Sequence, residues 1–298
     1  MGLIHNHIAV LMGPTGSGKS AVALSVARAR PTVIINADAM QMVDSLRVIT
    51  ARPSMKEEAE AEHALYGVLE PHEPTTVANW LTRVIPVIQH AWAEEKLPLL
   101  VGGTGMYIKA LMEGLASVPP IPEETRVTLR MMDAAKVRAE LDLRDPRMAA
   151  QLKPGDSQRN LRALEVMMAT GISLGEWQAK TTRPLLPEAT YHRFMILRER
   201  AEIYARIDAR FEVMMAAGAL EEVRALMALA LDPELPILRA HGVPELMAHL
   251  RGEMTLDDAT TKAQQNTRNY AKRQMTWLRN QWQGAAVVTD EAGILARF

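Results

Sequence analysis

A glycine-rich loop between an apolar strand and a helix constrains this 298-residue chain more than any other feature. Residues 13–20 read GPTGSGKS and match the pattern G-x-x-x-x-G-K-[ST]. An apolar run precedes them and an alanine-rich helical pattern follows. Glycines let successive backbone N–H groups turn inward, and the helix adds the positive end of its dipole. The motif predicts a phosphate-binding loop; the alternative is a chance match at a strand–helix turn.

Every residue of the loop is a candidate phosphate contact: Gly13, Pro14, Thr15, Gly16, Ser17, Gly18, Lys19 and Ser20. Lys19 supplies positive charge, and the Ser20 hydroxyl is a candidate Mg²⁺ ligand. ATPases and kinases usually add an acidic residue at the end of a neighbouring strand, where it holds Mg²⁺ near the γ-phosphate. Here the apolar run at 97–101 ends in Gly-Gly-Thr, and no Asn-Lys-x-Asp motif for guanine is present. The sequence therefore supports phosphate binding but not nucleotide hydrolysis.

Strand-like and helical patterns alternate through the first third of the chain. Apolar runs at 7–12, 32–37 and 97–101 predict strands, and the segments 19–30, 77–95 and 104–113 predict helices. This alternation predicts a parallel sheet. After the proline-rich break at 117–122, only helical periodicity appears until about residue 180. Strand-like runs return at 191–197 and 285–289, with long helices expected at 199–217, 219–230 and 255–282.

We therefore expect an α/β fold in which a P-loop, parallel-sheet core carries an all-helical insertion. The core would comprise residues 1–120 and 191–298, and the insertion residues 121–190. The absence of cysteine excludes disulfides, thiolate metal sites and a cysteine nucleophile. No apolar segment approaches the ~20 residues needed to cross a membrane, and the N-terminus lacks a basic signal region. A cytoplasmic protein with no membrane partner is the resulting expectation.

Two polar residues follow strands at the same predicted sheet edge as the loop. Asp38 follows the run at 32–37, and Thr104 follows the one at 97–101. Ligands of parallel sheets bind beyond the carboxyl ends of the strands, so a carboxylate should face the phosphate loop. Such a carboxylate can act as a general base or a metal ligand. The alternative for both residues is a helix cap, a role that Asp and Thr commonly fill.

Seven motifs, in this order and spacing, resemble the tRNA dimethylallyltransferases, most closely the bacterial members. They are GPTGSGKS (13–20), NADAMQ (36–41), TARPS (50–54), VGGTGMYIKAL…GL (101–115), DSQRNLRALEVMMATG (156–171), RIDARFEVMMAAGALEEV (206–223) and TRNYAKRQMTWLRN (267–280). Members of this family transfer a dimethylallyl group from its diphosphate to the exocyclic amine of the adenine just 3′ of the tRNA anticodon. The resemblance implies that the loop holds a diphosphate that leaves.

The resemblance also implies catalytic roles for Asp38, Thr104 and Arg206. Asp38 would hydrogen-bond the adenine amine and accept its proton, because the amine is a weak nucleophile. Thr104, Arg206, the loop and Mg²⁺ on Ser20 would stabilise the charge of the leaving diphosphate. Without the family, Arg206 would be interpreted as a solvated charge on the helix at 199–217.

The substrate implied on the other side is the tRNA anticodon stem-loop, with one adenine flipped from its stack. The implied tRNA contacts are Asp38, Ala39, Met40, Gln41 and Thr104 at the flipped base; Arg126, Gln158, Arg159, Asn160, Leu161 and Arg162 in the insertion; and Arg239, Gly242, Arg268, Lys272 and Arg273. The net charge of the chain is only −1, yet residues 259–289 contain Lys and Arg side chains and no Asp or Glu. A solvated helix face is the alternative there. Ala271, Met275, Leu278 and Trp282 share one helical stripe, which predicts core packing.

Some positions depart from the family pattern. Residues 42–45 read MVDS where the family has a hydrophobic residue followed by Tyr-Arg-Gly, and residues 239–244 read RAHGVP where it has Arg-x-Ile/Val-Gly-Tyr. Arg52 replaces the common lysine and Asn269 a glutamine. None of these changes falls on the loop, Asp38, Thr104 or Arg206, so activity is expected to be retained. A P-loop small-molecule kinase and a non-catalytic RNA-binding module are the alternatives; a monomer without protein partners is expected.

Overall fold

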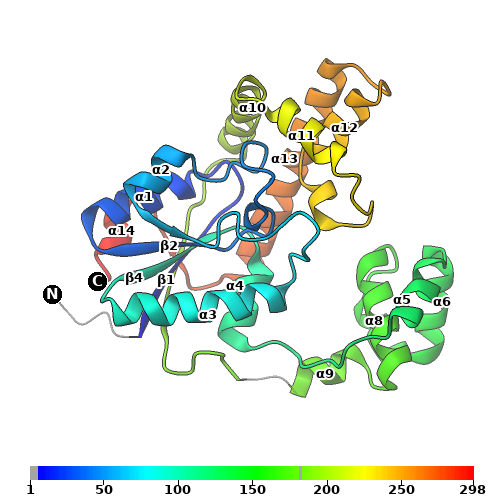
Figure 1. Ribbon diagram of the computed structural model, residues 1–298. Coiled ribbons are helices and arrows are strands. Elements are labelled where there is room, and N and C mark those ends of the chain that lie inside the picture. The colour runs from blue at the N-terminus through cyan, green and yellow to red at the C-terminus, as the bar shows by residue number, and fades with distance from the viewer. Residues whose placement is uncertain (1–5, 181–182) are drawn as a thin grey trace. The chain divides into compact units, whose positions relative to one another are not determined.

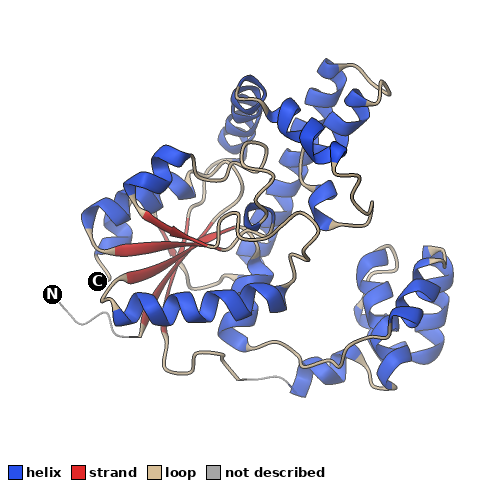
Figure 2. Ribbon diagram, in the orientation of Figure 1, coloured by secondary structure: helices blue, strands red, loops and turns tan. Residues whose placement is uncertain are grey.

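The computed structural model describes residues 6–180 and 183–298, and its parallel sheet carries the predicted loop. The described strands are β1 (His7–Met12), β2 (Thr32–Asn36), β3 (Glu62–Ala64), β4 (Leu97–Gly102), β5 (Thr190–Met195) and β6 (Ala286–Val287). Among the described residues they form one six-stranded sheet in the order β3-β2-β4-β1-β5-β6. All neighbouring strands pair in parallel (Figure 2). The α/β, parallel-sheet prediction is confirmed.

Helices cover both faces of the sheet (Figure 1). On one face, α1 (Lys19–Ala29) and α14 (Ala292–Leu295) pack on alternate strand residues such as Leu11 and Leu99. On the other face lie α3 (Val77–Ala93) and α4 (Gly105–Glu113). There the buried Trp80 stacks on Tyr107 with ring centroids 4.8 Å apart. Its indole N–H donates to the carbonyl of Asn36, 2.8 Å away, and so fixes α3 to the end of β2.

A second helical layer follows β5. It consists of α10 (Arg200–Ala216), α11 (Ala219–Ala228), α12 (Val243–Leu250) and α13 (Leu256–Gln281), with a 3₁₀ turn at Pro236–Arg239. These helices share a core with Val43, Leu46 and Ile49, which lie in the long connection between β2 and β3. That connection also contains a 3₁₀ turn (Met40–Met42) and α2 (Met55–Glu60). The predicted stripe of α13 is buried at all four positions, as core packing requires.

The chain divides into two compact units, Met1–Lys109 with Glu188–Phe298, and Ala110–Pro187. The second unit is helical where it is described: after the C-terminal half of α4 it contains α5 (Glu123–Arg130), α6 (Ala134–Arg144), α7 (Pro146–Gln151), α8 (Ser157–Thr170) and α9 (Leu174–Lys180). Leu141 and Leu164 lie in its own core. Asp133, Asp145 and Asp156 cap α6, α7 and α8 by accepting backbone N–H bonds. In the described parts of both units, every helix is too short or too polar to cross a membrane.

Candidate active site

The glycine-rich loop joins β1 to α1 at the carboxyl edge of the sheet. Gly16 and Gly18 have φ angles of +79° and +96°, which a side chain would strain. The ammonium of Lys19 donates to the carbonyl oxygens of Gly13 and Pro14, at 2.8 and 2.9 Å. The cation is therefore held against the start of its own loop.

Three arginines, one just before α10 and two on it, reach the same loop. Arg206 donates through Nε to the carbonyl of Gly16 at 2.8 Å, and Arg198 does the same to Ser17 at 2.8 Å. Arg210 donates to the hydroxyl of Thr15. Arg206 and Arg210 are four residues apart on α10, so they lie on the same helix face. Arg206 is thus in contact with the loop as well as half-exposed, and Arg210 is a further cation that the sequence motifs did not single out.

Asp38 lies just beyond β2, and its two carboxylate oxygens have different surroundings. Oδ1 accepts the backbone N–H of Met40 at 3.0 Å and so begins the following 3₁₀ turn. The backbone N–H of Asp38 itself donates to Asn36 Oδ1 at 2.8 Å, which fixes the start of the turn. Oδ2 makes no hydrogen bond within the described chain, and Asp38 lines the pocket that Lys19 also lines. The capping alternative therefore accounts for Oδ1 only, and Oδ2 is available to accept a proton or to bind a ligand.

The ends of β2 and β4 approach each other closely through the Gly-Gly-Thr turn. A Cβ on Gly102 would lie 2.1 Å from the carbonyl oxygen of Ala37, so no larger residue fits without moving the backbone. The Thr104 hydroxyl accepts the N–H of Ala39 at 3.2 Å, and its own N–H donates to Ala37. Thr104 thus ties the two strand ends together, and it is not among the residues that line the pocket.

Gln274 of α13 connects this turn to the phosphate loop. Its Oε1 accepts the N–H of Thr15 at 2.8 Å, and its Nε2 donates to the carbonyl of Gly103 at 3.3 Å. A Cβ on Gly103 would lie 2.1 Å from that nitrogen. Gln274 is buried among the apolar residues of the α13 stripe. The loop, the Gly-Gly-Thr turn and α13 therefore form one hydrogen-bonded assembly.

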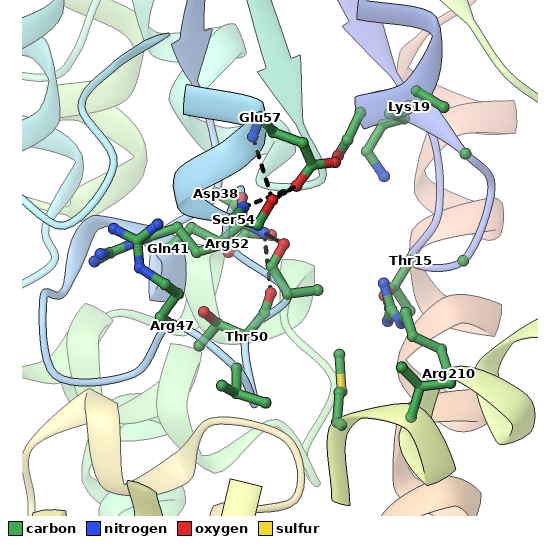
Figure 3. A pocket seen from close by; sticks show the side chains of 18 of the residues that line it. Thr15, Lys19, Asp38, Gln41, Arg47, Thr50, Arg52, Ser54, Glu57 and Arg210 are labelled. Atoms are coloured by element: carbon green, nitrogen blue, oxygen red, sulfur yellow. Dashed lines mark hydrogen bonds between the residues drawn. The ribbon is translucent and has the colours of Figure 1, made fainter. Parts of the chain in front are cut away.

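A pocket of about 850 Å³ lies between the phosphate loop and the segment 47–54 (Figure 3). Its walls include Lys19, Ser20, Asp38, Gln41, Arg47, Thr50, Arg52, Glu57, Arg206, Arg210 and Gln274, with apolar groups from Val48, Val213 and Met214. Burial lowers the pKa of Lys19 to about 8, although the charge of Asp38 opposes the shift. Burial also lowers the pKa of Arg210, against the same opposing charge. Cations for a phosphate and one carboxylate thus share a single cavity.

The predicted tRNA contacts of the first unit have varied surroundings. Arg239 is exposed and pairs with Glu234 at 2.7 Å. Arg268 pairs with Asp208, at 2.5 Å, so part of its charge is compensated. Lys272 and Arg273 are exposed on α13. Gly242 has a φ of +93°, and a Cβ there would lie 2.9 Å from Ile49 Cδ1. Close packing is therefore a sufficient reason for that glycine.

The predicted contacts of the second unit divide into exposed and buried residues. Gln158, Arg159 and Arg162 are exposed on α8, and Arg126 is half-buried on α5. Asn160 is buried, and its amide donates to the carbonyls of Lys153 and Pro154 at 3.1 and 3.0 Å. Leu161 packs against the unit's core. The last two side chains hold α8 in place, whereas the exposed ones are available to a ligand.

The site fits Mg²⁺ in the manner typical of phosphate-bound Mg²⁺. Among the described residues there is no group of three His, Cys, Asp or Glu able to hold a metal. Mg²⁺ at phosphate sites, however, takes few protein ligands and several phosphate or water oxygens. Ser20 is exposed in the first turn of α1 and lines the same pocket as Asp38. Its hydroxyl is the protein oxygen that would bind the ion.

Fold and site together define a P-loop α/β protein with a carboxylate facing its phosphate loop. The chain matches the family model described as IPP transferase over residues 41–281 and the isopentenyl transferase model over residues 6–66. It is 49% identical to the tRNA dimethylallyltransferase of Methylobacterium nodulans over 91% of each chain. It is 50% identical to that of Azorhizobium caulinodans, over 92% of this chain and 89% of the relative. The chain belongs to the tRNA dimethylallyltransferase family.

Solved structures agree with this assignment. The tRNA isopentenylpyrophosphate transferase of Bacillus halodurans superposes with a TM-score of 0.69 at 26% identity, covering 95% of this chain and 89% of that one. A eukaryotic dimethylallyltransferase acting on tRNA has a TM-score of 0.81 at 22% identity, covering 96% of this chain and 75% of that one. The latter likeness concerns the fold.

Proposed function

We infer that the protein is a tRNA dimethylallyltransferase. It transfers the dimethylallyl group of dimethylallyl diphosphate to the exocyclic amine of the adenine 3′-adjacent to the anticodon, and it releases diphosphate. The observation that carries this inference is that Asp38, Lys19 and Arg210 line one pocket, where the charge of Asp38 acts on both cations. A kinase would need an acid at the end of β4, where this chain has glycine. Family membership supplies the class of reaction.

The chemistry assigns opposite tasks to the two sides of the pocket. The amine nitrogen forms a bond to the first carbon of the allyl group while the carbon–oxygen bond to diphosphate breaks. Asp38 Oδ2 accepts a proton from the amine, and the bonding electron pair leaves with the diphosphate. Lys19, Arg206 and Arg210 stabilise the charge that develops there. Mg²⁺ on the Ser20 hydroxyl would neutralise part of the same charge.

The tRNA side rests on exposed cations and on a flipped base. Lys272 and Arg273 on α13, and Arg159 and Arg162 on α8, are assigned to backbone phosphates. Their contribution would appear as salt-dependent affinity. Thr104 acts on the site by fixing the turn that carries Asp38 and Ala39, since its hydroxyl bonds to Ala39.

Incubation with labelled substrates tests this function. The purified protein should move label from dimethylallyl diphosphate into unmodified tRNA, and mass analysis of the digested nucleosides should place it on the adenine amine. Label that enters tRNA only from ATP, or nucleotide turnover without tRNA, would contradict the proposal. Nucleosides from cells with and without the gene give the matching observation in vivo.

The kcat/KM for dimethylallyl diphosphate should fall at alkaline pH because Lys19 loses its proton. Burial lowers the pKa of Lys19 from 10.5 to about 8. Below that pH the side chain is charged and attracts diphosphate; above it, kcat/KM for dimethylallyl diphosphate should fall about tenfold per pH unit at saturating tRNA. The donor's terminal phosphate ionises near pH ~6 and is constant in this range. Lys19→Arg is the comparison, since guanidinium stays charged. A wild-type profile still flat one pH unit above the pKa would contradict the prediction.

A further inference from the structure

The side-chain amide of Gln41 has a fixed orientation on the pocket wall. Its Nε2 donates to two carbonyl oxygens, those of Thr50 and Ala51, each at 2.9 Å (Figure 3). Because both partners are acceptors, only the nitrogen of the amide can face them. Oε1 makes no hydrogen bond to the described chain, and Gln41 lines the pocket. The residue therefore offers an acceptor, and no donor, to whatever occupies the cavity.

The segment that supplies those two carbonyls is held by a carboxylate outside the pocket. Glu222 of α11 accepts three consecutive backbone N–H groups: Oε1 bonds Arg47 and Val48 at 2.5 and 2.9 Å, and Oε2 bonds Ile49 at 2.9 Å. Three converging N–H groups form an anion-binding nest, which the protein fills with its own carboxylate. The turn is thereby fixed immediately before Thr50.

Two further features bear on the conformation of this turn, which also has backbone bonds of its own from Ala51 to Val48 and from Arg52 to Arg47. Ala51 has a φ of +53°, a left-handed conformation that is unfavourable for alanine because its Cβ approaches the following carbonyl oxygen. On its other side the turn is fixed by Ile49, which lies against Gly242 in the core shared with α11 and α12. Glu222 and this packing together hold the strained conformation in which the Thr50 and Ala51 carbonyls both point at Gln41.

Asp38 and Gln41 are three residues apart, and each has a side-chain oxygen without a hydrogen bond inside the described part of the chain. Asp38 accepts the N–H of Met40, the first residue of the 3₁₀ turn in which Gln41 lies, and both residues line the cavity. The exocyclic amine of adenine has two N–H donors at its base edge, whereas guanine and hypoxanthine carry a carbonyl oxygen there. Two acceptors match an amine and repel a carbonyl.

We propose that Glu222 is a positioning residue that fixes which end of the Gln41 amide faces the pocket, so that Gln41, a base contact that the family resemblance implies, meets the adenine amine only as an acceptor. The inference rests on the proposed function and deepens it. Without Glu222 the turn relaxes, the Thr50 and Ala51 carbonyls separate from Gln41, and its amide rotates freely. A rotated amide presents NH₂ to the pocket and accepts a carbonyl-bearing base.

Binding of two anticodon stem-loops that differ only in the target base measures this selectivity. One carries adenine and the other hypoxanthine, and the readout is the ratio of their dissociation constants for the full-length protein. The wild type should prefer adenine by at least about tenfold. Gln41→Met removes the acceptor, and Glu222→Ala releases the turn; each should lower the ratio several-fold. Glu222→Gln keeps two of the three accepted bonds and should lie between the wild type and Glu222→Ala.

Glu221→Gln is the matched control. Glu221 is the neighbouring acid on α11, but it is exposed and pairs only weakly with Arg224, at 3.6 Å. The Glu221→Gln variant should equal the wild type in its ratio of dissociation constants for the two stem-loops and in its rate of prenyl transfer. Circular dichroism checks the fold of every variant, and Gln41→Met keeps the test decisive if Glu222→Ala does not fold.

The outcomes separate the inference from the function. If both variants weaken the two stem-loops equally and leave the ratio unchanged while the wild type transfers dimethylallyl groups, the inference is wrong and the function stands. If the wild type transfers no dimethylallyl group to tRNA, the proposed function fails and the inference with it. A reduced ratio with an unchanged KM for dimethylallyl diphosphate supports the polarity argument.

Discussion

Asp38→Asn will lower kcat for prenyl transfer by at least about 10²-fold, the usual contribution of a general base. The substitution keeps the shape of the side chain and an Oδ1 that can still accept the N–H of Met40, so the turn at residues 40–42 stays formed. What it removes is the negative charge of a side chain that lines the pocket. The loss should therefore fall on kcat, and binding of the anticodon stem-loop should change little.

Asp44→Asn is the control for this variant. Asp44 lies six residues further along the same connection and is exposed. It should retain full activity. Single-turnover kinetics with preformed enzyme–tRNA complex isolate the chemical step from product release. An Asp38→Asn enzyme with a near-normal single-turnover rate would show that the carboxylate is only the cap of its turn.

The parts of the fold that sequence predicted are those with a repeating apolar pattern. β1, β2 and β4 are continuous apolar runs because both faces of a parallel strand are buried, and the α13 stripe repeats with the helical period. β3 was missed because Glu62–Ala64 is a three-residue edge strand with exposed and half-buried residues. α12 was missed because a glycine and a proline, Gly242 and Pro244, resemble a break in sequence, whereas the proline occupies the first turn of the helix.

The site divides in a similar way between local and distant information. The loop motif, Asp38 and Thr104 could be selected from sequence because each follows a predicted strand, and parallel strands end at one edge. Gln274 and Glu222 form hydrogen bonds with residues that lie 259 and 173–175 positions away in the sequence, and no local pattern encodes such partners. One signal was available: a glutamine within the apolar stripe of α13 implies a buried hydrogen-bonding partner.

The sequence also does not show which residues of one motif are buried and which are exposed. Residues 158–162 match the family over five consecutive positions, yet on a helix consecutive residues point in different directions. Asn160 and Leu161 face the interior of their unit, and Gln158, Arg159 and Arg162 face solvent. A motif that is uniform in sequence thus combines residues that hold a helix in place with residues that can contact a ligand.

Lys19→Met will lower kcat/KM for dimethylallyl diphosphate by about 10²- to 10³-fold or more, the effect of removing one preorganised donor from a developing anion. The methionine keeps an apolar stem of similar length, so the loop retains its packing. It removes the ammonium that lies at the carbonyls of Gly13 and Pro14 and that shares the pocket with Arg206 and Arg210. The remaining arginines still attract diphosphate, so KM and kcat should both deteriorate without complete loss of binding.

The same substitution should not destabilise the free protein, because Lys19 is a functional residue that costs stability. Its pKa is about 8 in the folded protein, against the ordinary lysine value of 10.5 that applies to the unfolded chain. At neutral pH Lys19 is protonated in both the folded and the unfolded chain, and burial of its charge disfavours the folded state by roughly 3 kcal/mol. This penalty is present below pH 8 and is relieved as the pH rises toward 10.5. Thermal unfolding of Lys19→Met at pH 7 should thus give a Tm equal to or above that of the wild type, although two hydrogen bonds to loop carbonyls are lost.

Lys56→Met separates this effect from a general loss of positive charge. Lys56 is exposed on α2, whose N-cap Ser54 lines the same pocket, so its removal changes the net charge equally without touching the loop. Its kcat/KM and Tm should match the wild type. If Lys19→Met instead lowered the Tm by several degrees, the lost activity would reflect an unfolded loop, and the ammonium would be a structural tie between Gly13 and Pro14. An unchanged or higher Tm with the expected loss of activity would mean that the loop keeps a strained, desolvated charge for the diphosphate that leaves.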